Sequence, residues 1–531
     1  MNYADLFRVT LPETALEVAA LVVLVVDLGF LRKAALKVRV TVAALLGVAG
    51  CGAGLWALQL QGNTWQTFGA EFGAALLITG AYVKAAQTGI LVLTALTLLL
   101  LIDSDFTKHV GEFVAVVLMA ASGGLLIAGA VDLLVIFVGL ELLSLGLYIM
   151  TAFNKTSGKS AEAALKYYLF GGMSAAFLLF GFSYFYGLTG STNLVKIQEA
   201  IAASGPSPLF YVAWVLVVAG LGFKIAAVPF HLWAPDTYEG APAPAAAFIA
   251  SVSKVASFAL LLTISSNWLT LQPGSTSGTV GLASWLHAYD QIWTQLANVL
   301  LLPAAASMVV GNLAALAQVS VRRLLAYSAI AHAGYMLLGV ATLPHYPLPH
   351  YPTYLAELPL IPGKLQSVGL SANAVIYYIL TYGLTTIGAF GVVDVVQRAT
   401  GSDKMDAFLG LHKRNPVLAA VLLVLFLSLA GIPPLVGFWA KFNLFAAGLQ
   451  VSAGPVPFAL VALAVAFSAV SLYYYLQVLK RAYVLPAVDE TRIKVHPVTL
   501  VVLVGIAAAV VLLGCFPAVL QGWISSFYPA I

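Results

Sequence analysis

Cysteine is scarce in this chain, and its two cysteines exclude several classes of site. Cys51 and Cys515 lie in separate apolar runs, and no CxxC spacing is present. Iron–sulfur clusters and zinc sites need closely spaced thiolates, and a disulfide framework needs several paired cysteines. The sequence therefore predicts no cluster, zinc site or disulfide in this chain.

Charge is scarce as well. Charged residues make up 9% of the 531 residues, whereas 61% are hydrophobic, so most of the chain must lie in lipid. The formal net charge of +4 arises from basic residues dispersed between apolar runs, which argues against a nucleic-acid partner. P-loop and Rossmann glycine patterns are missing too. The first apolar run lacks a signal-peptide cleavage site, so we expect it to be retained as a helix.

Long apolar runs dominate what remains. A helix needs about 20 residues to cross a hydrocarbon core of about 30 Å. The sequence therefore predicts an all-α polytopic membrane protein with about 14 transmembrane helices. The predicted spans lie near residues 14–31, 39–60, 78–102, 112–130, 132–152, 162–188, 208–233, 243–266, 292–318, 322–343, 372–398, 415–449 (with a break), 457–480 and 497–516.

The basic residues test this map, because cytoplasmic connections carry most Lys and Arg. With both termini outside, the outer connections receive only Arg8, Lys196 and Lys364. The inner connections receive Arg32, Lys33, Lys37, Arg39, Lys108, Lys155, Lys159, Arg322, Arg323, Arg398, Lys404, Lys413, Arg414, Lys480, Arg481, Arg492 and Lys494. This asymmetry supports an even number of spans and this orientation.

Five lysines are left inside the predicted spans, where a charge costs roughly 2.5–3.5 kcal/mol on the insertion scale. Lys84 is near a helix end and is expected to reach the interface. Lys166 follows a glutamate by one turn, so a local ion pair explains it as well as function does. Lys224, Lys254 and Lys441 lie deeper, and for them the alternative to a functional role is a buried structural ion pair.

Three further ionisable side chains are predicted at depth. Glu141 lies halfway along its span and is the natural acidic partner for a buried lysine. His231 and His332 are the two deep histidines. A histidine in a helical core is more often a packing residue than a functional one, so both interpretations stay open.

Prolines predict two broken helices, one at Pro229 and one at Pro433 and Pro434. Proline removes a backbone hydrogen bond, which lipid tolerates only where the break is buried in protein or hydrated. Broken helices at equivalent places in two oppositely oriented units predict two inverted five-helix repeats. The predicted organisation is 1–111 (helices one to three), 112–266 and 291–480 (the repeats), and 481–531 (the last helix).

Three stretches closely resemble the antiporter-like membrane subunits of proton-pumping NADH:quinone oxidoreductase, respiratory complex I. They are GFKIAAVPFHLWAPDTYEGAPAPAAAFIASVSKVASFALL (222–261), NLAALAQVSVRRLLAYSAIAHAGYML (312–337) and LAGIPPLVGFWAKF (429–442). Three paralogues share that fold. PAAAFIASVSKVASF lacks the histidines typical of L and M, Lys441 stands where M has glutamate, and the long lateral helix of L is missing. The chain is therefore identified as a member of the subunit N family.

The resemblance implies roles for these residues. Glu141 and Lys224 would form an ion pair, Lys254 would be the central proton relay, and Lys441 would be the terminal carrier. His332 would lie along the hydrated axis.

Lys166 and His231 are weaker candidates for the same relay. Moving the carboxylate of Glu141 away would make Lys224 release its proton, because burial disfavours an ammonium and a nearby carboxylate favours it.

The resemblance also implies a setting. The chain itself would bind no cofactor, while NADH, FMN, iron–sulfur clusters and quinone would belong to partner subunits. M-type and K-type membrane subunits would be its neighbours in the bacterial inner membrane. Electron transfer in the partners would drive proton translocation through this chain.

Two alternatives stay open. One is an Mrp-type cation/proton antiporter on the same scaffold, and the other is a scaffold that has lost pumping. The outer segment 344–364 contains His345 and His350 in a repeated HYP unit. We interpret it as a proline-stiffened surface loop rather than a metal site.

Overall fold

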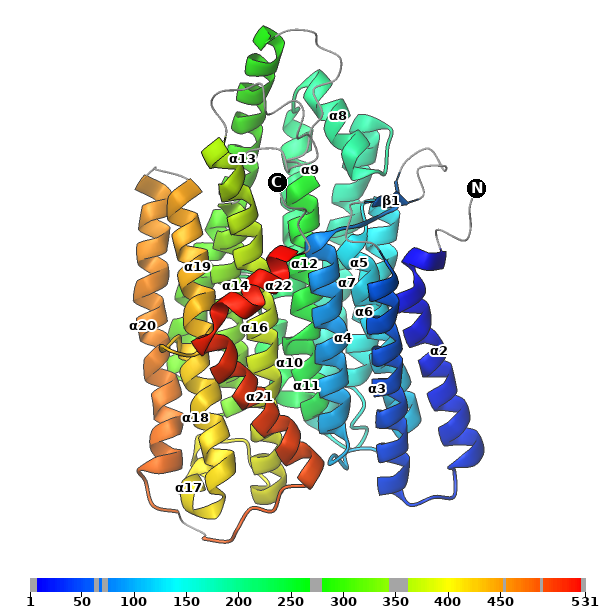
Figure 1. Ribbon diagram of the computed structural model, residues 1–531, viewed down its shortest axis with the longest axis vertical. Helices are drawn as coiled ribbons and strands as arrows, with labels where there is room; N and C mark the ends of the chain where they lie inside the picture. The colour runs from blue at the N-terminus through cyan, green and yellow to red at the C-terminus, as the bar shows by residue number, and fades with distance from the viewer. Residues whose placement is uncertain are drawn as a thin grey trace.

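Long helices, most of them antiparallel to their neighbours, make up nearly the whole of the computed structural model (Figure 1). The structure describes residues 7–61, 66–68, 75–267, 279–342, 362–451, 455–487 and 490–526. The predicted loop with His345 and His350 lies outside these residues, except that its last three residues form the start of a helix.

The elements follow one another along the chain with short connections. In the N-terminal part they are α2 (Leu11–Val25), the π-helical turn η1 (Val26–Phe30), α3 (Leu36–Leu60), β1 (Gln66–Phe68), β2 (Leu77–Thr79) and α4 (Ala81–Leu101). Next come α5 (Val110–Gly129), α6 (Leu133–Thr151), α7 (Gly158–Thr189), α8 (Leu194–Ser204), α9 (Pro208–Ile225), α10 (Trp233–Gly240), α11 (Ala243–Ala250) and α12 (Val252–Asn267). The rest are α13 (Thr279–Leu316), α14 (Val321–Ala341), α16 (Pro362–Thr400), the 3₁₀ turn η3 (Met405–Phe408), α17 (Leu411–Arg414), α18 (Pro416–Ala430), α19 (Val436–Val451), α20 (Pro455–Tyr483), α21 (Pro497–Cys515) and α22 (Pro517–Ser526).

The predicted class, an all-α polytopic membrane protein, is confirmed. Within the described ranges, 12 helices are long and apolar enough to cross a membrane. The two other predicted spans are shorter pieces: α2 has 15 residues and continues into η1, and the twelfth span is divided into α18 and α19. The count of fourteen and the inverted repeats stay predictions.

Helix α16 lies at the centre of the packing. It contacts α4, α11, α12, α14, α18, α19 and α21. The C-terminal helices α21 and α22 cross the bundle obliquely and also contact α4 (Figure 1). Elements from both ends of the chain therefore surround the same central helix.

Side-chain caps fix where several helices begin. An oxygen of the residue before the helix accepts a backbone N–H of the first turn, which satisfies a donor that has no partner inside the helix. The caps are Asp132 for α6, Ser157 for α7, Asn193 for α8, Ser207 for α9, Ser320 for α14 and Asn415 for α18.

Around Pro229, where the first break was predicted, α9 ends at Ile225 and α10 begins at Trp233. Ala226 takes the left-handed conformation with φ 59°. The N–H of Val228 donates to the Ser307 hydroxyl on α13 at 2.9 Å, so a neighbouring helix satisfies a backbone group that the break frees.

The second predicted break separates α18 from α19 in a similar way. Gly431 ends α18 in the left-handed conformation with φ 88°, and Pro434 follows it by three residues, as Pro229 follows Ala226. The N–H of Ile432 donates to the carbonyl of Leu427 at 3.0 Å.

A third break was not predicted. The eighth span divides at Ser251 into α11 and α12. The Ser251 hydroxyl donates to the carbonyl of Ala247 at 2.6 Å, and that of Ser253 donates to Ile249 at 2.9 Å. Serine hydroxyls that bond to carbonyls four residues back often bend helices, which is the physical reason for the interruption.

Candidate proton relay

Lys224 lies on the last turn of α9, next to the first break, and is 7% exposed. Its ammonium donates a hydrogen bond to the Ser144 hydroxyl on α6. Glu141 lies one turn before Ser144 on α6, but within the described residues it forms no ion pair with Lys224. The ion pair expected from the resemblance is therefore not closed in this structure, because the hydroxyl one turn further along α6 takes the ammonium.

Aromatic rings complete the surroundings of Lys224. Its ammonium lies 5.9 Å from the ring centroid of Tyr148 and 5.6 Å from that of Phe223. Behind these rings, Tyr167 stacks on Trp233 with centroids 4.2 Å apart. The negative faces of aromatic rings attract an ammonium group, so they support the charge where water is scarce.

Lys254 lies on α12, just after the break at Ser251, and is 2% exposed. Its ammonium donates to the carbonyl of Ala329 on α14 at 2.5 Å and lies 5.8 Å from the ring centroid of Tyr382 on α16. No carboxylate of the described part of the chain pairs with it. The alternative of a buried structural ion pair is therefore excluded for Lys254 within those ranges.

Lys441 lies on α19, after the second break, and is 5% exposed. Its ammonium donates to the carbonyl of Ala430 at 2.9 Å and to the Ser468 hydroxyl at 2.8 Å. In a continuous helix the Ala430 carbonyl would accept from residue 434, but that residue is Pro434, which has no N–H. The break thus supplies the acceptor that stabilises the buried ammonium.

His332 lies on α14 and is 3% exposed. Its Nδ1 is 2.9 Å from the Tyr378 hydroxyl, whereas its Nε2 has no hydrogen-bond partner among the described residues. The ring is packed against Tyr382, with centroids 4.9 Å apart, and against Tyr335, with centroids 5.7 Å apart. These contacts place the imidazole beside the tyrosine that Lys254 faces.

Two weaker candidates, Lys166 and His231, lie apart from the four central residues Glu141, Lys224, Lys254 and Lys441. Lys166 is 40% exposed and pairs with Glu162 and Asp236 at 2.7 Å each, so it belongs to an ion network at the end of the bundle. His231 lies half-buried in the turn between α9 and α10, and it makes no hydrogen bond with any of the four central residues. Among the described residues, neither Lys166 nor His231 makes a hydrogen bond or ion pair with Lys224.

Lys84 lies in the first turn of α4 and is 3% exposed. Its ammonium donates to the carbonyl of Gln61 at the end of α3. A cation is favourable at a helix C-terminus, where carbonyl groups lack partners. Its burial therefore has a structural explanation.

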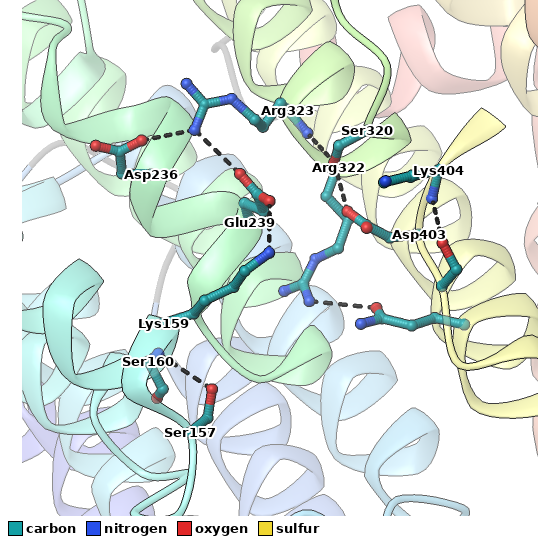
Figure 2. Close-up of polar contacts among 12 residues, drawn as sticks. Ser157, Lys159, Ser160, Asp236, Glu239, Ser320, Arg322, Arg323, Asp403 and Lys404 are labelled. Atoms are coloured by element: carbon teal, nitrogen blue, oxygen red, sulfur yellow. Dashed lines mark hydrogen bonds and ion pairs between the residues drawn. The ribbon is translucent and has the colours of Figure 1, made fainter.

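Charged side chains cluster where α7, α10 and α14 meet (Figure 2). Arg323 donates to Asp236 at 2.6 Å and to Glu239 at 3.0 Å, and Lys159 donates to Glu239 at 3.1 Å. Burial alone would raise the pKa of Asp236, but hydrogen bonds from Lys166 and Arg323 outweigh it and hold that pKa below its usual value. We call this cluster, with Glu162, the α10 ion network.

A cavity of about 330 Å³ adjoins the α10 ion network. Its walls come from the connections after α4, α6 and α16, from the α10–α11 turn, and from the start of α14. Arg322, 4% exposed, lines it and donates to the carbonyl of Ala241 and to Gln397 (Figure 2). Several of the predicted inner connections therefore border this one cavity.

Within the described residues, no group of three or more His, Cys, Asp or Glu side chains could hold a metal ion. The central site consists of lysines, tyrosines, serines, one histidine and the single carboxylate of Glu141. Such a set can bind and release protons, but ammonium groups repel a bound metal cation.

Several residues of the site were not singled out from the sequence. Ser144 and Tyr148 lie one and two turns after Glu141, so their shared helix face was a signal that sequence reasoning missed. Tyr335, Tyr382 and Ser468 had no such signal. Their places next to the lysines depend on how separate helices pack.

Known proteins are similar to this chain along most of its length. The family model described as "NADH:quinone oxidoreductase/Mrp antiporter, TM" matches residues 130–286, 274–348 and 365–468. The chain is 46% identical to NADH-quinone oxidoreductase subunit N 2 of Acidobacterium capsulatum over 99% of both chains.

Two solved structures are also similar. A chain of respiratory complex I from Thermus thermophilus is 30% identical, covers 96% of this chain and 98% of its own length, and has a TM-score of 0.73. A chain of the Mrp complex from Dietzia sp. DQ12-45-1b covers 98% of both chains with a TM-score of 0.76, but at 18% identity it shows the fold alone. The identity and coverage of the relatives show that this chain belongs to the subunit N family of NADH-quinone oxidoreductases.

Proposed function

We propose that this chain moves protons across the bacterial inner membrane through Glu141, Lys224, Lys254 and Lys441. As a member of the subunit N family, it is one membrane subunit of an NADH-quinone oxidoreductase complex. The observation that supports the proposal best is that the three lysines are buried beside helix breaks and have no ion-pair partner among the described residues.

The chemistry of such sites favours proton transfer. A buried ammonium costs roughly 2.5–3.5 kcal/mol on the insertion scale, so it persists only where oxygens compensate it. Here the compensating groups are hydroxyl and backbone carbonyl oxygens, which carry no charge. Because no fixed carboxylate holds the proton, a modest change in the surroundings of each lysine is enough to release it.

Glu141 provides such a change. It lies one turn from the hydroxyl that Lys224 contacts, so a small rotation of α6 or α9 would bring the carboxylate to the ammonium or take it further away. Approach would favour the protonated lysine, and withdrawal would favour transfer toward Lys254. Like charges on Lys254 and Lys441 would then drive the proton outward.

The energy has to come from outside the chain. Moving one elementary charge against 100 mV costs about 2.3 kcal/mol. NADH, FMN, iron–sulfur clusters and quinone are assigned to partner subunits, whose electron transfer would drive the relay. M-type and K-type subunits would be the membrane neighbours, and both termini would lie on the outer side of the membrane.

An Mrp-type cation/proton antiporter is the less supported alternative. The Mrp complex shares the fold, but a sodium site would need several carboxylates and hydroxyls that converge on one point. The deep groups at the breaks are lysines, which disfavour a bound cation.

The test is Lys254→Ala in the assembled complex. We expect NADH-driven proton uptake into inverted vesicles to fall about tenfold or more, because the central proton carrier is lost. Electron transfer from NADH to a soluble artificial acceptor should stay normal. Lys155→Ala, on an exposed connection, is the matched control. Full proton uptake by Lys254→Ala would overturn the proposal.

A further inference from the structure

His332 lies between two tyrosine rings, each of which faces one of the last two lysines of the proposed relay. Lys254 faces the ring of Tyr382, and Lys441 faces the ring of Tyr335 with its ammonium 5.5 Å from the centroid. The imidazole contacts both rings, edge-on to Tyr335 and tilted on Tyr382. A group that could accept and donate a proton therefore stands between two proton carriers.

The hydrogen bond to Tyr378 determines which imidazole nitrogen carries the proton. The Tyr378 side chain is 1% exposed, and its hydroxyl has no hydrogen-bond partner other than His332 Nδ1 among the described residues. A buried hydroxyl without an acceptor is costly, so Tyr378 donates its proton to Nδ1. The neutral imidazole must then carry its own proton on Nε2, the nitrogen without a partner.

A small cavity adjoins the imidazole. It has a volume of about 10 Å³, and the side chains of His332, Tyr378, Tyr382, Thr385 and Ser428 are among its walls. This volume is close to the minimum that one water molecule occupies. Such a water would also need at least two polar partners.

Ser428 offers the second polar partner. Its hydroxyl oxygen accepts from the N–H of Gly437 at 3.2 Å, which leaves its own proton and one lone pair for another contact. Ser428 lies on α18, two residues before Ala430, whose carbonyl accepts from Lys441. The cavity therefore connects the imidazole to the break that holds Lys441.

We propose that Tyr378 is a positioning residue of the relay: its hydroxyl fixes the imidazole tautomer in which His332 Nε2–H donates to one water molecule held between His332 and Ser428. The water completes the path from Lys254 to Lys441 on the side of the second break. Each proton transfer breaks one N–H or O–H bond and forms another along a hydrogen bond, so no oxidant, reductant or leaving group is needed. The inference rests on the proposed function, because it adds a residue to that path.

The experiment compares Tyr378→Phe with Tyr377→Phe in the whole complex. Tyr377 precedes Tyr378 on α16, is equally buried, and its hydroxyl has no partner among the described residues. It is therefore a matched control for loss of a buried hydroxyl. We expect Tyr378→Phe to lower NADH-driven proton uptake about three- to tenfold, as for the loss of one net hydrogen bond at a reacting group, and Tyr377→Phe to change it little.

A second measurement separates positioning from packing. In a His332→Ala background, Tyr378→Phe should cause no further loss, because the hydroxyl acts only through the imidazole. Additive losses, or equal effects of Tyr378→Phe and Tyr377→Phe, would overturn the inference. The proposed function fails separately, by normal proton uptake in Lys254→Ala, so the two outcomes are distinguishable.

Discussion

The ammonium of Lys224 donates to the hydroxyl of Ser144 rather than to the carboxylate of Glu141. A neutral hydroxyl accepts the hydrogen bond of the buried ammonium, and the carboxylate of Glu141 lies one turn away from that hydroxyl on α6. This arrangement differs from a closed ion pair, in which a buried charge would be strongly fixed. It leaves the lysine able to respond to small movements between α6 and α9.

Ser144→Ala should weaken this site directly. The ammonium would lose its hydroxyl acceptor, and a hydrogen bond to a charged group is worth about 1.5–3 kcal/mol. We expect slower NADH-driven proton uptake with normal assembly of the complex. Ser183→Ala is the control, because that hydroxyl is exposed and bonds only within its own helix. Equal rates in the two variants would contradict the role of Ser144.

Glu141→Gln should lower coupled activity by about tenfold or more, because the amide has nearly the same shape but cannot move a negative charge toward Lys224. Assembly should be unaffected, since Glu141 holds no ion pair among the described residues. Proton uptake and quinone reduction are measured together in membranes. Glu162→Gln, 65% exposed on α7, is the matched control. Normal coupling in Glu141→Gln would count against the relay.

Gly431→Ala should disturb Lys441. Gly431 has φ 88°, where a side chain costs about 1–3 kcal/mol, and an added Cβ would lie 3.0 Å from Lys441 Cδ. We expect lower thermal stability of the purified complex together with lower proton uptake. Gly505→Ala, where an added Cβ meets nothing within 4 Å, should leave both unchanged or slightly raise stability. A harmless Gly431→Ala would show that this break tolerates displacement.

The α10 ion network should make the folded state less stable as the pH becomes acidic. Hydrogen bonds hold the pKa of Asp236 below its ordinary 3.8, so the unfolded chain binds protons more readily than the folded chain. The stabilisation that the Asp236 carboxylate contributes to the folded state is therefore complete above about pH 5, and it is lost as pH falls through the lowered pKa.

Asp236→Asn should remove that pH-dependent part. At neutral pH it should cost about 1 kcal/mol or less, because the carboxylate is partly exposed. The measurement compares the thermal unfolding midpoints of the wild-type and Asp236→Asn complexes between pH 7 and acid pH. A midpoint difference that stays constant over this range would contradict the assigned role of the carboxylate.

Much of the central site was predictable because its signals are local. A lysine inside an apolar run, such as Lys254, costs free energy in the membrane wherever its helix packs. A proline removes an N–H in any surroundings, so the breaks at Pro229 and Pro434 followed from the residues themselves. The break at Ser251 was missed, because a serine bends a helix only where its hydroxyl turns back to a carbonyl.

The sequence by itself determined that this is a helical membrane protein with buried lysines beside broken helices, since apolar length and proline chemistry act along the chain. Only the tertiary structure decided which oxygen each ammonium contacts. Ser144 rather than Glu141 accepts from Lys224, and tyrosine rings stand between Lys254 and Lys441. The reason is that these partners lie on other helices, and the rotation and depth of one helix against another depend on the packing of the whole bundle.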